Sequence, residues 1–274
     1  MKGTLIAVVL VVGAFLLLRV LARSITFPRP RAPFPSETQL ESRCPNARLV
    51  AYETARGISS KGIVVRAGSR ADARVLYFHG NAESAMQNLP FAEELARHGI
   101  DTFLAEYRGY SGLSGRPTEA VLYQDGEAAL RAFGDVPDSP GIVFVGRSLG
   151  SGVAVEIASR RPPRLLILIS PYTSLVDMGR SLVGPLAPVL VPDRFDNLSK
   201  IAALTCPIVI LHGTRDEVVP FEMGRRLAAA GRNVRFVPLE GRGHNDIPDL
   251  PRLLLNEIRS ALQVGAPEGA RDPS

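Results

Sequence analysis

The sequence predicts one α/β domain, in which a mostly parallel central sheet carries helices on both faces, preceded by an N-terminal transmembrane helix. The 274 residues are 46% hydrophobic, which suffices for one large domain with a sizeable core. From residue 74 onward, strand-like runs alternate with helical patterns, as in a parallel sheet built through right-handed crossovers. These runs are apolar throughout, which is expected of strands buried on both faces.

The first element is the uncharged run "TLIAVVLVVGAFLLL", residues 4–18, which Arg19 interrupts and residues 20–22 extend. About 19 helical residues at ~1.5 Å each give roughly 28 Å, the thickness of a bilayer core. We therefore expect a transmembrane anchor over residues 1–23. A cleaved signal peptide is the alternative, with Lys2 before the apolar run. A buried core helix is disfavoured because apolar residues occupy every face of the expected helix.

The excess of basic residues lies beside this segment. Residues 1–48 contain seven basic and two acidic residues, whereas residues 49–274 contain 25 of each. A nucleic-acid-binding protein would carry its basic face on the folded domain, so we expect no nucleic-acid partner. More basic groups follow the apolar run than precede it, which favours a cytoplasmic position for the domain of a single-pass membrane protein.

Residues 24–47 are predicted to be a Pro-rich linker, because four prolines in residues 26–37 favour an extended spacer. The domain is expected over residues 48–264, and it begins with a hairpin. Residues 171–200 contain four prolines and are too long for an ordinary connection, so we expect a short lid there. Residues 265–274 are expected to be a disordered tail.

The expected elements follow in order. The expected strands are 48–56, 61–67, 74–80, 101–107, 141–146, 164–170, 206–213 and 233–239, and the expected helices are 83–98, 118–133, 149–160, 221–230 and 247–263. The spacing of Cys44 and Cys206 indicates neither a disulfide framework nor a metal site. We therefore expect two free thiols.

A serine between two glycines stands where one strand becomes a helix, in "GRSLG", residues 146–150. Gly146 and Gly150 flank Ser148. A tight turn would explain the pattern, since glycine and serine are both common in turns. The sharper interpretation is a nucleophile elbow, which holds a serine oxygen exposed at the top of a sheet.

A serine hydroxyl needs a base, and the chain has four histidines. His79 and His212 stand at strand ends, where packing or hydrogen bonding is the plain interpretation, and His98 precedes a glycine at a helix end. His244 lies in the glycine-rich loop "GRGHND" between the last strand and the last helix. It is therefore the predicted base.

The histidine needs an acid that holds its tautomer. Asp216 follows a strand by a short turn, at the edge of the sheet where Ser148 is expected. A turn aspartate that bonds its own backbone is the alternative role. Asp246 is too near His244 in sequence to reach the far ring nitrogen, and Asp177 lies inside the lid segment.

Negative charge on the substrate oxygen must be met by donors that are already in position. One predicted donor is the backbone N–H of Leu149, at the start of the helix after Ser148. The other is the N–H of Asn81, in the loop after "LYFHG", where Gly80 permits the turn.

Five stretches carry a family resemblance: "YFHGNAES", "EYRGYSGLSGRPTE", "GRSLGSGVAVEIAS", "CPIVILHGTRDEVVP" and "GRGHND". With them the chain resembles the α/β-hydrolase superfamily, most of all its membrane-anchored Bem46/ABHD13-like branch. The resemblance implies the fold, an N-terminal anchor and these site residues: Ser148, Asp216 and His244 as the triad, Asn81 and Leu149 as oxyanion donors. The chain departs from the family at Ser111, where glycine is frequent.

These observations predict a serine hydrolase that cleaves ester or thioester bonds of acyl or lipid-like substrates through an acyl-enzyme. No metal or organic cofactor is expected. One alternative is a serine peptidase of the same fold, which usually needs a larger cap than residues 171–200 can build. The other is a membrane-tethered binding protein without turnover, which a missing triad residue would favour.

Overall fold

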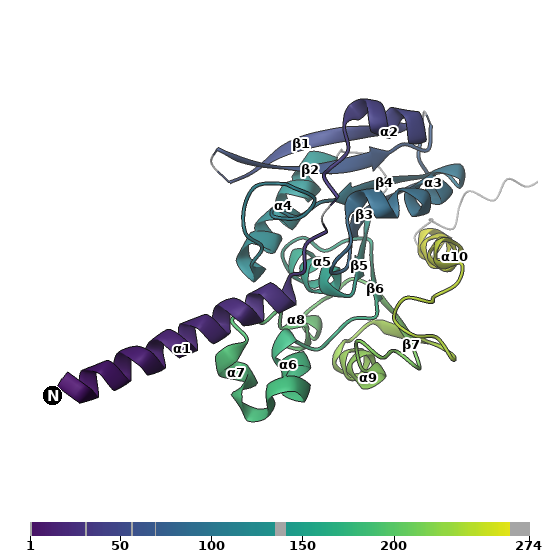
Figure 1. The fold of residues 1–274 in the computed structure, drawn as a ribbon. Helices are drawn as coiled ribbons and strands as arrows, with labels where there is room; N and C mark the ends of the chain where they lie inside the picture. Colours follow the sequence, from purple (N-terminus) through teal and green to yellow (C-terminus); the bar gives the residue numbers. More distant parts are fainter. Residues whose placement is uncertain (1, 31, 56, 69, 135–140, 264–274) are drawn as a thin grey trace, which may run out of the picture.

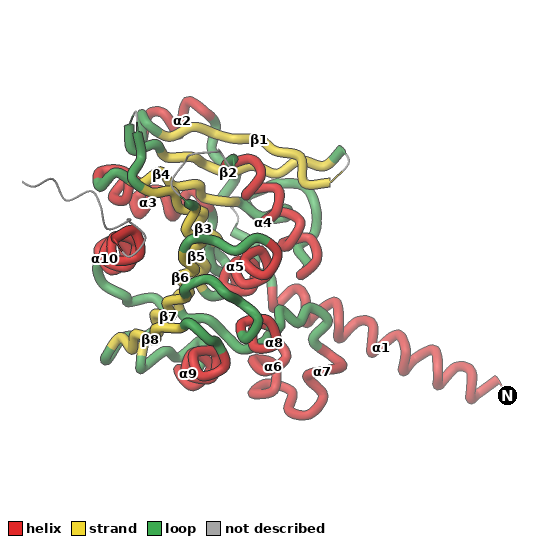
Figure 2. The backbone as a smooth tube through the Cα atoms, turned by 180° about the vertical axis from the view of Figure 1, so that it is seen from behind, coloured by secondary structure: helices red, strands yellow, loops and turns green. Residues whose placement is uncertain are grey.

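The structure is a computed structural model, and it covers most of the chain. It describes residues 2–30, 32–55, 57–68, 70–134 and 141–263, without the side chains of residues 2–9, 11, 262 and 263. The tail expected at residues 265–274 lies outside the described residues. The described helices lie on both sides of a central sheet (Figures 1 and 2).

The central sheet has eight strands in the order β1-β2-β4-β3-β5-β6-β7-β8. Their bounds are β1 Ala47–Ala55, β2 Ile58–Val65, β3 Ala73–Phe78, β4 Ile100–Ala105, β5 Ile142–Arg147, β6 Leu165–Ile169, β7 Ile208–Gly213 and β8 Val234–Leu239. The pairs β1–β2 and β2–β4 are antiparallel, and the other five are parallel. The predicted mostly parallel sheet is thus confirmed.

Helices cover both faces of the sheet, as predicted (Figure 2). One face carries α3 (Leu89–Arg97) and α10 (Leu250–Gln263). A short 3₁₀ turn, η1 (Ala85–Asn88), precedes α3. The other face carries α4 (Glu119–Phe133), α5 (Leu149–Arg160) and α9 (Phe221–Ala230). Each face has its own hydrophobic cluster.

Strand β3 shows why the inner strands are apolar at every position. All six of its residues are buried. Val75 and Tyr77 belong to the cluster beneath α3 and α10, whereas Leu76 and Phe78 belong to the cluster beneath α4 and α5. Alternate side chains therefore supply two separate cores, and neither face tolerates a run of polar residues.

The topology also places the functional edge. Strands β4 and β5 lie on opposite sides of β3, so the strand order reverses between β3 and β5. In open α/β sheets, ligands bind beyond the carboxyl ends of the strands at such a point. The loops that follow β3 and β5 contain Asn81 and Ser148, respectively.

The segment expected as a lid contains short helices. They are α6 (Leu175–Val183), the 3₁₀ turn η2 (Gly184–Leu186) and α7 (Ala187–Leu190), and they lead to α8 (Asn197–Ile201). The Ser174 side chain caps α6 by accepting from Asp177 N at 3.0 Å. Helix α7 contacts α1, and Leu182 and Leu186 on this segment are 80% and 59% exposed.

The N-terminal segment forms one helix, α1 (Lys2–Thr26), which extends away from the sheet (Figure 1). Among the described residues, none of the helices has the length and apolar character that crossing a membrane requires. The prediction of a transmembrane anchor over residues 1–23 is therefore not supported. The C-terminal end of α1 is attached to the domain, where Arg23 Nε donates to Asp193 Oδ2 at 2.8 Å.

Residues 24–47, expected to be a linker, contain a helix that was not predicted, α2 (Glu37–Arg43). Ser36 Oγ accepts from Gln39 N at 3.2 Å, and Gln39 Oε1 accepts from Ser36 N at 2.9 Å. This capping box was readable as S-x-x-Q. Leu40 is buried in the cluster beneath α3, so this part of the expected linker packs on the domain. The two cysteines are buried and free.

Candidate active site

Ser148 has a strained backbone at the junction of β5 and α5. Its φ is 49° and its ψ is −117°, a positive-φ conformation that residues with a side chain rarely adopt. The strain is held in place because Ser148 N donates to Ile169 O at 2.9 Å, and Ser151 N donates to Ser148 O at 2.9 Å. Strain that the surroundings enforce in this way is typical of functional positions, and it fits a nucleophile elbow.

The two glycines around Ser148 allow a close approach of α5 to the sheet. A Cβ on Gly150 would lie 2.0 Å from Phe78 O, and a Cβ on Gly146 would lie 2.6 Å from Gly150 O. Both contacts are with backbone atoms, which cannot swing away. Glycine at both positions is therefore a packing requirement, and it brings the start of α5 against the end of β3.

The predicted base and acid lie together although they are 28 residues apart in sequence. His244 Nδ1 is 2.8 Å from Asp216 Oδ2 and 3.0 Å from Asp216 Oδ1. An ionised carboxylate only accepts hydrogen bonds, so Nδ1 carries a hydrogen and, in the neutral ring, Nε2 keeps a free lone pair. A histidine held in this tautomer can act as a general base.

Asp216 is kept ionised by its neighbours. Burial alone would raise its pKa, but hydrogen bonds from His212, His244 and Val219 N outweigh burial and hold the pKa well below its ordinary value. Val218 N and Val219 N donate to Oδ1 at 2.9 and 2.8 Å. Asp216 therefore has both roles considered from the sequence, since it closes its own turn and also faces the histidine.

Arg147 connects the loops around Ser148, and sequence reasoning missed it. Its Nη2 donates to Asn245 Oδ1 at 2.9 Å and to His244 O at 3.4 Å, while its Nη1 pairs with Glu83. The loop that carries the predicted base is thus attached beside the elbow. Among the described hydrogen bonds, none joins Ser148 Oγ to His244, and in proteins without substrate such contacts are often long.

The loop after β3 lies directly beside Ser148. A Cβ on Gly80 would lie 3.5 Å from Ser148 Cβ. The Asn81 side chain is engaged elsewhere: Nδ2 donates to Thr26 O at 2.6 Å, and Oδ1 accepts from Tyr110 OH at 2.8 Å. Within the described part of the chain, Asn81 N donates to no acceptor, so this N–H is available to a ligand.

The second predicted donor is Leu149 N, in the first residue of α5. The first N–H groups of a helix have no partner inside the helix and carry its partial positive charge. Leu149 N, at the start of α5, and Asn81 N, in the loop after β3, therefore lie on two segments that adjoin Ser148.

The remaining candidates have other partners. His79 is buried and contacts Gly80 O and Glu106. Asp177 accepts from Thr173 Oγ1 at 2.7 Å, and Asp246 accepts from Gly243 N. His98 is half-exposed and pairs with Glu94. The expectation that these groups do not act on Ser148 agrees with their contacts.

The model of the family described as serine aminopeptidase, S33, matches residues 69–194. An uncharacterized protein of Mycobacterium tuberculosis is 36% identical over 249 residues, which cover 88% of this chain and 86% of that protein. The human alpha/beta hydrolase domain-containing protein 17B is 35% identical over 201 residues, covering 71% and 68% of the two chains.

Solved esterases share the fold. The Pyrococcus furiosus esterase Pf2001 has a TM-score of 0.68 at 18% identity and covers 87% of this chain and 97% of its own. Est1E from Butyrivibrio proteoclasticus, solved with ferulic acid bound, has a TM-score of 0.64 at 18% identity and covers 78% and 98%. At this identity the likeness concerns the fold.

Gly150→Ala is expected to destabilise the protein, because the new methyl group meets the backbone at Phe78. We expect a loss of about 2 kcal/mol or more, which for a chain of this size lowers Tm by roughly 4–8 °C. Thermal unfolding monitored by circular dichroism measures it. Gly13→Ala is the control, since a Cβ there meets nothing within 4 Å. Equal Tm values for the two variants would contradict the packing argument.

Asp216→Asn is expected to reduce kcat by about 10³–10⁴-fold, because the amide favours the wrong histidine tautomer. The lowered pKa of Asp216 stabilises the fold above the unfolded-state value of about 3.9, and this stability is lost as pH falls through the folded-state pKa. The stability difference from wild type should therefore be largest near pH 7 and shrink below pH 4 in urea titrations. Asp246→Asn serves as the control, and a difference independent of pH would refute the assignment.

Proposed function

Because the chain belongs to the α/β-hydrolase family, we propose that it is a serine hydrolase with Ser148 as nucleophile, His244 as base and Asp216 as the acid that orients it. The observation that carries the proposal is the Asp216–His244 pair, because Arg147 attaches the loop of His244 beside the strained serine. A turn without catalytic purpose would need neither the strain nor the pair.

The reaction proceeds in two halves. Ser148 Oγ attacks the carbonyl carbon and loses its proton to His244 Nε2, while the oxyanion accepts from the N–H groups of Asn81 and Leu149. His244 then gives the proton to the departing alcohol or thiol, which leaves an acyl-serine. Water attacks this ester as His244 takes its proton, and the acid product leaves with Ser148 restored. Asp216 stays ionised throughout and stabilises the imidazolium.

Ester or thioester substrates with an acyl, lipid-like portion are the proposed class. Several solved structures that share this fold are titled esterases, which supports an oxygen-ester substrate. The matching family description names an aminopeptidase, so a peptidase is the second candidate. Hydrolysis rates of p-nitrophenyl esters, acyl thioesters and aminoacyl p-nitroanilides distinguish the three substrates.

We also propose that the protein contacts a lipid surface through one apolar patch, formed by α1 and the α6–α7 segment, which touch each other. Its exposed apolar residues include Leu16, Leu17, Val20, Leu21, Ile25, Leu182, Leu186 and Val189. Arg19 and Arg180 lie on the same helices and would favour anionic lipid headgroups.

Labelling by a fluorophosphonate probe tests the nucleophile. Wild-type protein should react, Ser148→Ala should lose the label, and His244→Ala should label at least about 100-fold more slowly because the general base is gone. Ser159→Ala removes an exposed hydroxyl further along α5 and should label like wild type. Folded wild-type protein that does not label would favour the binding-protein alternative.

Replacing Leu182 and Leu186 together by serine should weaken binding to vesicles of phosphatidylcholine and phosphatidylserine by about tenfold or more, because two exposed apolar side chains no longer enter the lipid. Co-sedimentation measures the effect. Ile58→Ser, at a 43% exposed position on the β1–β2 hairpin, is the matched control. Unchanged binding of the double variant would rule out this surface.

A further inference from the structure

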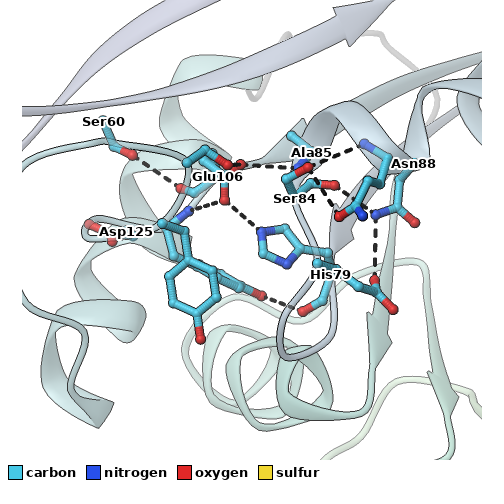
Figure 3. Close-up of polar contacts among 12 residues, drawn as sticks. Ser60, His79, Ser84, Ala85, Asn88, Glu106 and Asp125 are labelled. Atoms are coloured by element: carbon cyan, nitrogen blue, oxygen red, sulfur yellow. Dashed lines mark hydrogen bonds and ion pairs between the residues drawn. The ribbon is translucent and has the colours of Figure 1, made fainter. Parts of the chain in front are cut away.

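A second histidine–carboxylate pair is formed by His79, two residues before Asn81, and Glu106, and Figure 3 shows the two side chains facing each other. His79 and Glu106 are both fully buried, and they come from the ends of the neighbouring strands β3 and β4. His79 Nε2 is 2.8 Å from Glu106 Oε1, and His79 Nδ1 is 2.8 Å from Gly80 O. Both ring nitrogens are therefore occupied, so His79 has no free nitrogen for general-base chemistry.

The partners of this pair determine its charge. Gly80 O can only accept, so His79 Nδ1 carries a hydrogen. The backbone N–H groups of Tyr107 and Ala85 donate to Glu106 Oε1 and Oε2, both at 3.1 Å. Both oxygens therefore already accept hydrogen bonds, which is the pattern of an ionised carboxylate, and Oε1 also accepts from His79 Nε2. With a hydrogen on each ring nitrogen, His79 is an imidazolium cation held against that carboxylate.

The groups around His79 support this charge state. Those that titrate and face its ring are Glu106, Glu83, Tyr107 and Tyr110. Burial works to lower the pKa of His79, but the charge and hydrogen bond of Glu106 outweigh it and raise the pKa above its ordinary value. Burial raises the pKa of both tyrosines far above neutrality, so they contribute no charge.

The bond to Gly80 O determines where Asn81 N–H points. The carbonyl of Gly80 and the N–H of Asn81 belong to one planar trans peptide group, in which C=O and N–H point in opposite directions. Because Gly80 O faces the buried His79 Nδ1, Asn81 N–H faces away from the buried pair. The preceding peptide group is held too, since Tyr107 OH donates to His79 O at 3.0 Å and Gly80 N donates to Glu83 Oε2 at 3.1 Å.

We propose that His79, held by Glu106 and assisted by Tyr107, positions the Gly80–Asn81 peptide as an oxyanion donor for acyl transfer at Ser148. The inference rests on the proposed function, because it needs Ser148 as the nucleophile. These three are positioning residues, since they act through the peptide and touch no reacting atom. The cation also polarises the peptide group through Gly80 O, which strengthens Asn81 N–H as a donor.

Two substitutions at His79 separate this role from a merely structural one. In His79→Asn the amide nitrogen stands near the former Nδ1 and can still donate to Gly80 O, whereas in His79→Gln it stands near the former Nε2 and faces Glu106. We expect kcat on a p-nitrophenyl ester to fall roughly 10²–10³-fold in His79→Gln with KM little changed, as when one oxyanion donor is lost. His79→Asn should recover at least about tenfold of that loss.

Affinity for a trifluoromethyl ketone gives an independent readout, because its adduct with Ser148 carries an oxyanion in the same position. His79→Gln should weaken this inhibitor by about the same factor as kcat/KM. If both His79 variants lost kcat equally, in proportion to their losses of Tm, the inference would be overturned. The proposed triad would be unaffected by that result. Wild-type protein that neither labels nor hydrolyses esters would overturn the proposed function and the inference together.

Two tyrosine variants decide the matter if the His79 variants do not fold, because each removes a single oxygen. Tyr107→Phe frees His79 O, and we expect kcat to fall about fivefold with KM unchanged. Tyr110→Phe is the matched control, since among the described hydrogen bonds its hydroxyl reaches the Asn81 side chain alone, and that side chain keeps its bond to Thr26 O. Equal kcat values in these two variants would overturn the inference.

Discussion

The close approach of α5 to the end of β3 is the constraint on which the rest of the site depends. The helix begins so near Phe78 O that Gly150 cannot carry a side chain. That approach forces the chain at Ser148 into its strained turn and brings Leu149 N next to the loop of Asn81. The parallel pairing of β3 with β5 sets the distance between the two loops, so the sheet itself acts as the scaffold for the donors.

Two histidine–carboxylate pairs flank this point, and their surroundings give them opposite properties. In the Asp216–His244 pair, the carboxylate holds Nδ1 and leaves Nε2 without a protein partner among the described contacts, so the ring can exchange a proton. In the Glu106–His79 pair, both ring nitrogens are bonded and the ring is sealed from water. A histidine beside a carboxylate is therefore free to exchange a proton in one place and is held as a fixed charge in the other.

Local patterns explain what could be predicted from the sequence. The apolar strands, the helix after Ser148 and the order of Ser148, Asp216 and His244 follow from short-range signals, and the structure brings the last two residues together. The links of Arg147 to Glu83 and to Asn245 could not be anticipated, because they join residues 64 and 98 positions apart and depend on the sheet register. The same holds for His79 and Glu106. The apolar run of residues 4–18 predicted a membrane span, but hydropathy alone does not tell which turns attach to the domain.

Ser111 stands where the resembling family often has glycine, and a hydrogen bond of its side chain compensates for the change. Its φ of 48° is the conformation that glycine adopts without strain, which explains why glycine is frequent there in the resembling family. Serine accepts the strain here because its hydroxyl donates to Glu106 Oε2 at 2.8 Å. The carboxylate that holds His79 thereby gains a donor that glycine could not supply. A substitution in the loop after β4 thus adds a hydrogen bond to the same buried pair that orients the loop after β3, and the two loops share one electrostatic centre.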